Sequence, residues 1–431
     1  MKHSTILKAS YRIRLAFFGL FLLSPLGACA KTTPSFLPQS NLTVAPTALT
    51  TPTPVPGITE TATPFPTSTS TPLPTPTLTP TPLPRQVTLL AVGDDLVHGS
   101  TLNGGLQADG TYDFNGFYRH LKEEISAADI AVINQETILG GSEFEYSGYP
   151  LFNTPDAMGD AIVNAGFDVV LHATNHTMDK GGKGVENCMN FWKTTYPEIT
   201  VLGIYDSTEA QNTVTVIEKN GIRIAMLNYT YGLNGIPIPA GKNYLVTLLT
   251  WSNRDYIRSQ IRQAKELSDF VIVFPHWGTE YVYEPDNNQL FWTTLFAEEG
   301  VDLVIGAHPH VLEPVEWIQR PDGGEMLVFY SLGNFISGQI EAPRLLGGMA
   351  EVTLTETEDG SVKITESAVI PVVTHYSDQV GDGTYSTYRL SDYTEELLRT
   401  HGIHKRAEES VFTLEDTWAL ARKLLGDFLK E

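Results

Sequence analysis

VDLVIGAHPH, residues 301–310, is the stretch on which the interpretation of the fold depends. Its apolar half, Val301 to Ile305, predicts a buried strand, and His308 and His310 follow that strand directly, where loops commonly carry chemistry. Pro309 favours an extended conformation at His308, which places the two imidazoles on the same side of the chain. Two such imidazoles suggest a metal site. A lone His-Pro-His is more simply a loop with solvated histidines, so the metal interpretation needs ligands from elsewhere.

Polar side chains also follow four other apolar runs, each of which is predicted to be a buried strand. In an α/β fold the carboxyl ends of such strands gather at one edge of a sheet, so the side chains that follow them can converge. The runs are residues 87–92, 130–133, 168–172 and 270–274, with predicted helices between them. The residues at their ends are Asp94, His98, Asn134, Glu136, Asn175, His176, His276 and Glu280.

The recurrence of polar residues at strand ends favours a metal site over a separate explanation for each residue. Taken alone, an aspartate can cap a turn, an asparagine can be a turn residue, and a histidine can pack in the core. With His308 and His310 included, the main candidates supply two carboxylates, one amide and three imidazoles, about what a pair of divalent ions needs. His176 adds a proton donor or acceptor near neutral pH. The weaker candidates are His98, Asn134 and Glu280.

The N-terminal residues predict an export signal. Residues 2–14 carry four basic side chains and no acidic one, and the apolar run that follows, Leu15 to Leu26, is too short to span a bilayer as a helix. Leu26-Gly27-Ala28-Cys29 resembles the lipobox of bacterial lipoproteins, in which the cysteine is acylated. We expect residues 1–28 to be a signal peptide and Cys29 to anchor the protein at the extracytoplasmic face of the membrane. An uncleaved N-terminal anchor is the alternative.

Residues 30–84 predict a disordered, solvated spacer between the anchor and the globular part. They are rich in Thr, Ser and Pro, a composition that cannot bury enough apolar surface to fold. The formal net charge of −22 argues against nucleic acid as a partner, because non-specific binding needs clustered lysine and arginine. An anionic substrate therefore has to be held locally, for example by metal ions.

The globular part is predicted to be an α/β domain over residues 85–375, followed by a helical extension over residues 376–431. Asn220-Gly221 joins two strand-like runs and is a strong hairpin signal. Residues 349–355 and 362–370 alternate as an antiparallel pair does. The C-terminal extension contains one amphipathic run, residues 414–429, which predicts a helix packed on the outside.

The motifs at the strand ends occur in an order that resembles the CapA family, whose members are poly-gamma-glutamate capsule synthesis proteins related to calcineurin-like metallophosphatases. The resemblance covers about Val87 to Ile370. Its motifs are Gly93-Asp94, Asn134-Gln135-Glu136, Asn175-His176 with Asp179 and Gly181, His276-Trp277-Gly278 with Glu280, Gly306 to His310, and Tyr330 to Phe335.

The resemblance implies a metallophosphatase-like four-layer α/β/β/α sandwich with a centre for two divalent ions, of Mn, Fe, Zn or Mg. By position, it implies that His176 is a catalytic acid or electrostatic stabiliser. Asn134-Gln135-Glu136 departs from the aspartate-based motif of true phosphatases. The implied ligands are Asp94 and His310 for the first metal, Glu136 as the bridge, and Asn175, His276 and His308 for the second metal.

With the export signal and lipobox-like sequence, our leading hypothesis is an exported, membrane-tethered protein that acts on or with an anionic cell-surface polymer, and the resemblance implies that this polymer is poly-gamma-glutamate. If the protein is catalytic, the metals are expected to acidify a water molecule and polarise a phosphoryl or amide oxygen while His176 assists the leaving group. A non-catalytic scaffold or polymer-binding subunit of a membrane synthase fits the tether and spacer equally well. A broad extracellular phosphoesterase is a third possibility.

Overall fold

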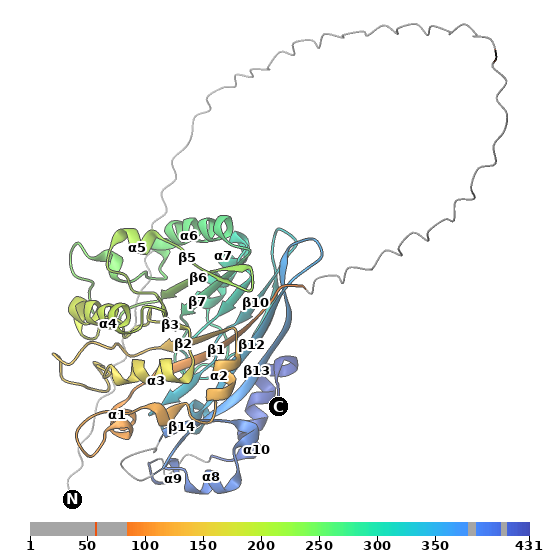
Figure 1. Ribbon diagram of the computed structural model, residues 1–431. Helices are drawn as coiled ribbons and strands as arrows, with labels where there is room; N and C mark the ends of the chain where they lie inside the picture. The colour runs from red at the N-terminus through yellow and green to blue at the C-terminus, as the bar shows by residue number, and fades with distance from the viewer. Residues whose placement is uncertain (1–56, 58–83, 378–384, 407–411) are drawn as a thin grey trace, which may run out of the picture. The chain divides into compact units, whose positions relative to one another are not determined.

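The computed structural model describes Gly57 and residues 84–377, 385–406 and 412–431 (Figure 1). The described residues from Pro84 onward belong to one compact unit, Thr79–Glu431. The predicted signal peptide, the lipidation site Cys29 and almost all of the predicted spacer lie outside the described residues. Within the described part of the chain, no helix is long and apolar enough to cross a membrane.

The first sheet is mixed, with eight described strands in the order β14-β13-β12-β1-β2-β3-β4 and β11 paired to β1. β1 to β4 run parallel, whereas β12 to β14 continue the sheet in an antiparallel arrangement. Its strands are β1 (Gln86–Leu96), β2 (Ile130–Gln135), β3 (Val169–Leu171), β4 (Thr200–Leu202), β11 (Asn334–Ser337), β12 (Leu346–Glu356), β13 (Val362–Tyr376) and β14 (Tyr385–Arg389).

The second sheet has six described strands in the order β5-β6-β7-β8-β10-β9, with parallel central strands and an antiparallel strand at each edge. The β5–β6 pair turns at Asn220-Gly221, as the hairpin signal predicted, and both residues have positive φ. Its strands are β5 (Thr215–Lys219), β6 (Ile222–Thr230), β7 (Phe270–His276), β8 (Leu303–Ile305), β9 (Val315–Gln319) and β10 (Glu325–Phe329).

Alternating side chains of the second sheet show how the layers pack. In β7, Phe270, Ile272 and Phe274 belong to the same apolar core as β1 and β2. Val271 and Val273 instead pack in a separate core with helices α6 (Arg254–Leu267) and α7 (Asn287–Glu299). One face of the second sheet therefore lies against the first sheet and the other against helices. The predicted sandwich of two sheets between helices is confirmed.

The helices cover the outer faces of the two sheets (Figure 1). Apolar side chains of α2, α3 and α4 join the core of the first sheet, and those of α6 and α7 join the outer core of the second. The helices are α1 (Gly99–Gly105), α2 (Lys122–Ala127), α3 (Ala157–Ala165), α4 (Gly181–Thr195), α5 (Thr208–Asn212), α6 (Arg254–Leu267), α7 (Asn287–Glu299), α8 (Glu395–Thr400), α9 (Ile403–Arg406) and α10 (Leu414–Leu425).

The region predicted as a helical extension, residues 376–431, contains a strand in addition to helices. β14 pairs with β13, which itself runs through the expected boundary to Tyr376. Within the described residues of this region, the helices are α8, α9 and α10. The C-terminal region therefore completes an edge of the first sheet.

β1 is longer than the strand predicted from the apolar run of residues 87–92. β1 continues to Leu96 because β11 pairs with it beyond Gly93, and the register shifts beside Asp94. A Cβ atom on Gly93 would lie 1.9 Å from the backbone oxygen of Gly333, so this close approach requires glycine. Asp94 therefore projects from within a strand, held by neighbours on both sides.

Candidate metal centre

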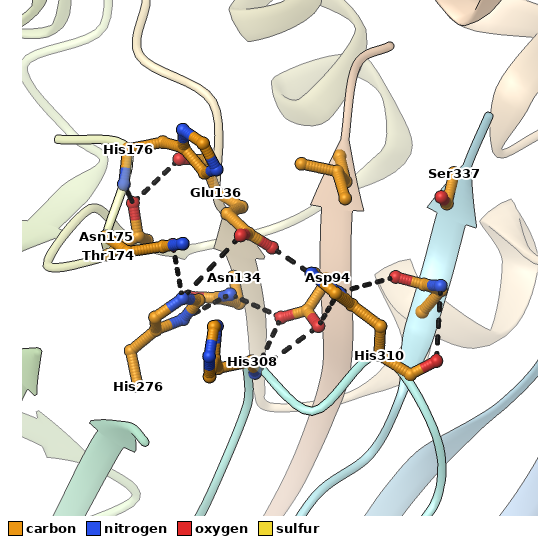
Figure 2. A network of polar contacts seen from close by, with 12 residues as sticks. Asp94, Asn134, Glu136, Thr174, Asn175, His176, His276, His308, His310 and Ser337 are labelled. Atoms are coloured by element: carbon orange, nitrogen blue, oxygen red, sulfur yellow. Dashed lines mark hydrogen bonds and ion pairs between the residues drawn. The ribbon is translucent and has the colours of Figure 1, made fainter. Parts of the chain in front are cut away.

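The predicted ligands come together between the two sheets, at the carboxyl edge of their parallel strands (Figure 2). The first sheet contributes Asp94 from β1, Glu136 after β2 and Asn175 after β3. The second sheet contributes the remaining ligands, which are His276 at the end of β7 and His308 and His310 after β8. All six side chains are buried. The convergence predicted from strand ends is therefore what the fold produces.

Asp94 lies at the centre of the hydrogen-bond network. Its Oδ1 accepts a hydrogen bond from Asn134 Nδ2 at 2.8 Å, and its Oδ2 accepts one from His310 Nδ1 at 2.9 Å. The backbone N–H of His308 approaches both carboxylate oxygens at 3.3 Å. Asp94 is thus fixed by one partner in its own sheet and by two from the second sheet.

The His-Pro-His loop bends more sharply than the sequence predicted. His308 has a φ of 102° and His310 a φ of 58°, so the expected extended conformation at His308 is wrong. Positive φ angles are unusual for residues with a Cβ atom. They occur only where contacts with the surrounding structure hold the backbone in place. Gly306, just before the loop, packs so closely that a Cβ atom there would lie 2.1 Å from the backbone oxygen of Tyr330.

Glu136 is the residue whose surroundings point most directly to a cation. Both of its carboxylate oxygens are buried without a hydrogen-bond partner. The nearest basic atoms are His276 Nε2, 3.7 Å from Oε1, and His310 Nδ1, 3.8 Å from Oε2. Burial raises the pKa of Glu136 well above its usual value, although His310 opposes this effect. An unpartnered buried carboxylate is costly, and a divalent ion would satisfy it.

The donor set as a whole fits divalent ions. Within the described chain, three groups of side chains have ligand atoms within 4.8 Å of one another. His308 Nδ1 is, like the Glu136 oxygens, buried without a partner. Oxygen and imidazole ligands together suit zinc, iron and manganese. The groups are Glu136, His276 and His308; Asp94, Glu136 and His310; and Glu280, His308 and His310.

The three candidate histidine ligands differ in protonation state. Burial lowers the pKa of His276 and of His308 well below the usual value, and neighbouring imidazoles add to this. Both are therefore held in the neutral form, which is the form that binds metals. Burial also acts to lower the pKa of His310, but Glu136 and Asp94 outweigh it and raise the pKa to about 9.

Asn175 and His176 lie next to each other at the edge of the centre. His276 Nε2 donates a hydrogen bond to Asn175 Oδ1 at 2.9 Å, so Asn175 orients a candidate ligand. His176 Nδ1 donates to Asp179 Oδ2 at 2.7 Å, and the same oxygen accepts from the backbone N–H of Phe152 at 2.8 Å. This pairing leaves Nε2 of His176 available for proton transfer.

The three weaker candidates take different positions. Asn134 bonds Asp94 and approaches His276 Nδ1 at 3.4 Å, so it supports ligands. Glu280 shares a ligand group with His308 and His310 but is exposed. His98 belongs to none of the three ligand groups found among the described residues, and its Nδ1 accepts a hydrogen bond from Gly338 N at 3.3 Å.

Two residues near the centre were not among the predicted site residues. Asp179 holds His176, and Asn334 Oδ1 accepts a hydrogen bond from His310 Nδ1 at 3.1 Å. Both residues lie within the family motifs quoted above, so the sequence alone could have marked them as candidates. Their contacts could not be predicted, because Asn334 reaches His310 only through the unpredicted pairing of β11 with β1.

The fold and the site define a two-sheet α/β protein with a candidate metal centre where the sheets meet. Residues 88–339 match the sequence model described as Bacterial capsule synthesis protein PGA_cap, and the chain belongs to this family. The predicted family membership is thereby confirmed.

Two curated relatives and one solved structure illustrate the similarity. The PGA biosynthesis protein CapA of Bacillus subtilis (strain 168) is 32% identical over 173 residues, 40% of this chain and 43% of that protein. The capsule biosynthesis protein CapA of Bacillus anthracis is 31% identical over 183 residues, 42% of each chain. The matched stretches thus span less than half of each relative. The NAD nucleotidase of Haemophilus influenzae aligns with a TM-score of 0.39 at 12% identity, over 79% of this chain and 59% of that one.

Proposed function

We propose that this protein is exported, anchored to the cell membrane through Cys29, and acts on poly-gamma-glutamate at the cell surface through a centre of two divalent ions. The observation that carries the proposal is the buried carboxylate of Glu136, whose two oxygens have no partner and face the imidazoles of His276 and His310. Membership of the capsule synthesis family, and the relatives' names, support the choice of polymer.

The reaction that suits this centre is hydrolysis of an amide bond in the polymer. Divalent ions held by Asp94, Glu136, Asn175 and the three histidines would polarise a substrate oxygen and acidify a water molecule. Hydrolysis places the water oxygen on the carbonyl carbon, breaks the C–N bond and releases an amine, which takes up a proton. His176 can donate that proton from Nε2, while Asp179 fixes its Nδ1 and stabilises the charged ring.

Metal analysis of the purified protein tests the centre directly. We expect about two equivalents of divalent ion per chain after purification in metal-supplemented buffer, one for each ion of the proposed pair. Less than one equivalent of any divalent ion would contradict the proposed centre. The chain length of poly-gamma-glutamate incubated with the metal-loaded protein then tests the reaction, and shortening is the expected result.

The rival interpretation is a non-catalytic scaffold or polymer-binding subunit of a membrane synthase. Replacing His276 and His308 with alanine separates the two. If polymer output in cells is unchanged while the variant remains folded, the metal centre is dispensable and the scaffold interpretation is correct. A panel of phosphate mono- and diesters, used as alternative substrates, tests the third interpretation, an extracellular phosphoesterase.

A further inference from the structure

The positively charged side chain of Arg344 stacks on the ring of Tyr281, which lies beside the candidate ligand His310. The Tyr281 ring centroid is 6.0 Å from that of His310, and Tyr281 is 38% exposed. Arg344, in the short 3-10 segment η4 (Ala342–Leu345), places its guanidinium carbon 3.4 Å from the centre of the Tyr281 ring. This stacked arrangement holds a permanent charge at the rim of the centre.

A polar network ties this arginine to the candidate ligands. Asn334 accepts a hydrogen bond from His310 Nδ1 at 3.1 Å and donates from Nδ2 to the backbone oxygen of Arg344 at 2.9 Å. Gln339 Oε1 accepts from Asn334 Nδ2 at 3.1 Å, and Gln339 Nε2 donates to the Tyr281 hydroxyl at 3.2 Å. The position of the guanidinium is therefore fixed relative to His310 before any ligand arrives.

Most of the hydrogen-bonding capacity of Arg344 is unused among the described residues, and its side chain is 22% exposed. Its Nη1 pairs with Glu341 Oε2 at 2.7 Å, the one polar partner of this guanidinium among the described residues. A guanidinium carries five N–H donors, so several remain for a ligand. The Glu341 side chain is 48% exposed, and an ion pair with so exposed a partner is weak and can be displaced.

We propose that Arg344 is a specificity-determining residue that binds a carboxylate of the polymer next to the amide presented to the metal centre. This inference rests on the proposed function. Each repeat of a γ-linked glutamate chain carries one free carboxylate beside its amide, and a planar guanidinium binds a carboxylate through two parallel hydrogen bonds. The formal charge of the chain is −22, so an anionic polymer needs such a local cation.

Calorimetric binding of a short γ-linked glutamate oligomer to the metal-loaded protein tests this role. Arg344→Gln should weaken binding about 10- to 100-fold, the effect of losing hydrogen bonds to a charged group, and Arg344→Lys should weaken it less. Glu341→Gln should strengthen binding, because it removes the competing carboxylate. A purely structural role for Arg344 predicts no such gain.

Arg254 provides a matched control, because its guanidinium carbon lies 4.2 Å from the ring centre of Trp251, outside the metal centre. Arg254→Gln should leave the affinity for the oligomer unchanged. Thermal unfolding of each variant separates a loss of binding from a loss of structure. Weakened binding in folded Arg344→Gln, with normal binding in Arg254→Gln, supports the inference.

The contrary outcomes are distinguishable. If the wild-type protein binds the oligomer and Arg344→Gln binds it equally well, the role of Arg344 is refuted while the proposed function stands. If the metal-loaded wild-type protein does not bind the oligomer, the proposed substrate fails and the inference fails with it. Binding of glycerol phosphate in place of the oligomer would refute the carboxylate assignment and favour a phosphoesterase.

Discussion

Asn134 Nδ2 donates a hydrogen bond to Asp94 Oδ1 at 2.8 Å, and the two residues face each other across the parallel β1–β2 pair. The neutral amide of Asn134 holds Asp94 without adding to the negative charge of the neighbouring carboxylates Asp95 and Glu136. A bound cation would offset the charge of the carboxylates already gathered there.

Asn134→Asp should destabilise the metal-free protein, because it replaces a hydrogen bond with repulsion between two buried carboxylates. We expect a lower melting temperature in the presence of a chelator and recovery of much of the loss when Mn²⁺ or Zn²⁺ is added. Thermal unfolding with and without metal measures both effects. Asn103→Asp, at an exposed position, is the control and should change little. Equal behaviour of the two variants would contradict the proposed role of Asn134.

Removing a candidate metal ligand should reduce the amount of bound metal, whereas removing a residue outside the ligand groups should not. His276→Ala and His308→Ala should each lose at least one equivalent of bound ion, whereas His98→Ala should retain the wild-type amount because His98 belongs to none of the ligand groups. Metal analysis after exhaustive dialysis gives the comparison. Loss of metal in His98→Ala alone would show that the centre is assembled differently.

Replacing His176 or Asp179 should impair catalysis without changing the metal content. General acid catalysis contributes about 10²- to 10⁴-fold, so His176→Ala should lower kcat by about that factor. Asp179→Asn should lower it less, because Asp179 holds the ring through Nδ1 and does not itself donate the proton. A variant that keeps full kcat with normal metal content would exclude His176 as the proton donor.

Glu313, which is not a proposed metal ligand, should make the free energy of unfolding depend on pH. Its side chain is buried, it accepts a hydrogen bond from Gln289 Nε2 at 2.6 Å, and its Oε1 has no partner. Burial raises its pKa to about 8, against the lowering effect of the Gln289 hydrogen bond. Between pH 4.5 and 8 the folded protein retains this proton and the unfolded chain releases it, so stability falls as pH rises.

Glu313→Gln should remove that pH dependence. Denaturant unfolding across the same pH range should show that the variant loses less stability toward alkaline pH than the wild-type protein does. Glu358→Gln, at an exposed position, serves as the control and should follow the wild-type curve. An unchanged slope in Glu313→Gln would mean that this carboxyl group is ionised in the folded protein.

Much of the candidate centre could be predicted from the sequence because its candidate ligands follow apolar strand runs. Glu136, His276 and His308 each come at or just after such a run, and the parallel order of the strands brings them to one edge. The pattern of residues also distinguished the hairpin at Asn220-Gly221 from the parallel crossovers. These signals are local, so a single sequence carries them.

The remaining features depend on contacts that are distant in sequence. The backbone of His308 bends against the bias of Pro309 because the tertiary surroundings, including Asp94, hold its N–H. β11 is a four-residue strand whose pairing with β1 extends that strand past Gly93. Short strands and positive φ values have little local signature, so tertiary contacts decide them.

The candidate ligands of the centre are divided between two separate sheets, with Asp94 and Glu136 from one and His276 and His308 from the other. An ion coordinated by both sets would act as a cross-link between layers that also meet through side-chain packing and through hydrogen bonds such as His310 to Asp94 and His276 to Asn175. Sliding one sheet over the other by a single residue would pull the coordinating atoms apart. Metal loading would therefore lock the relative alignment of the two halves of the sandwich and oblige them to unfold together.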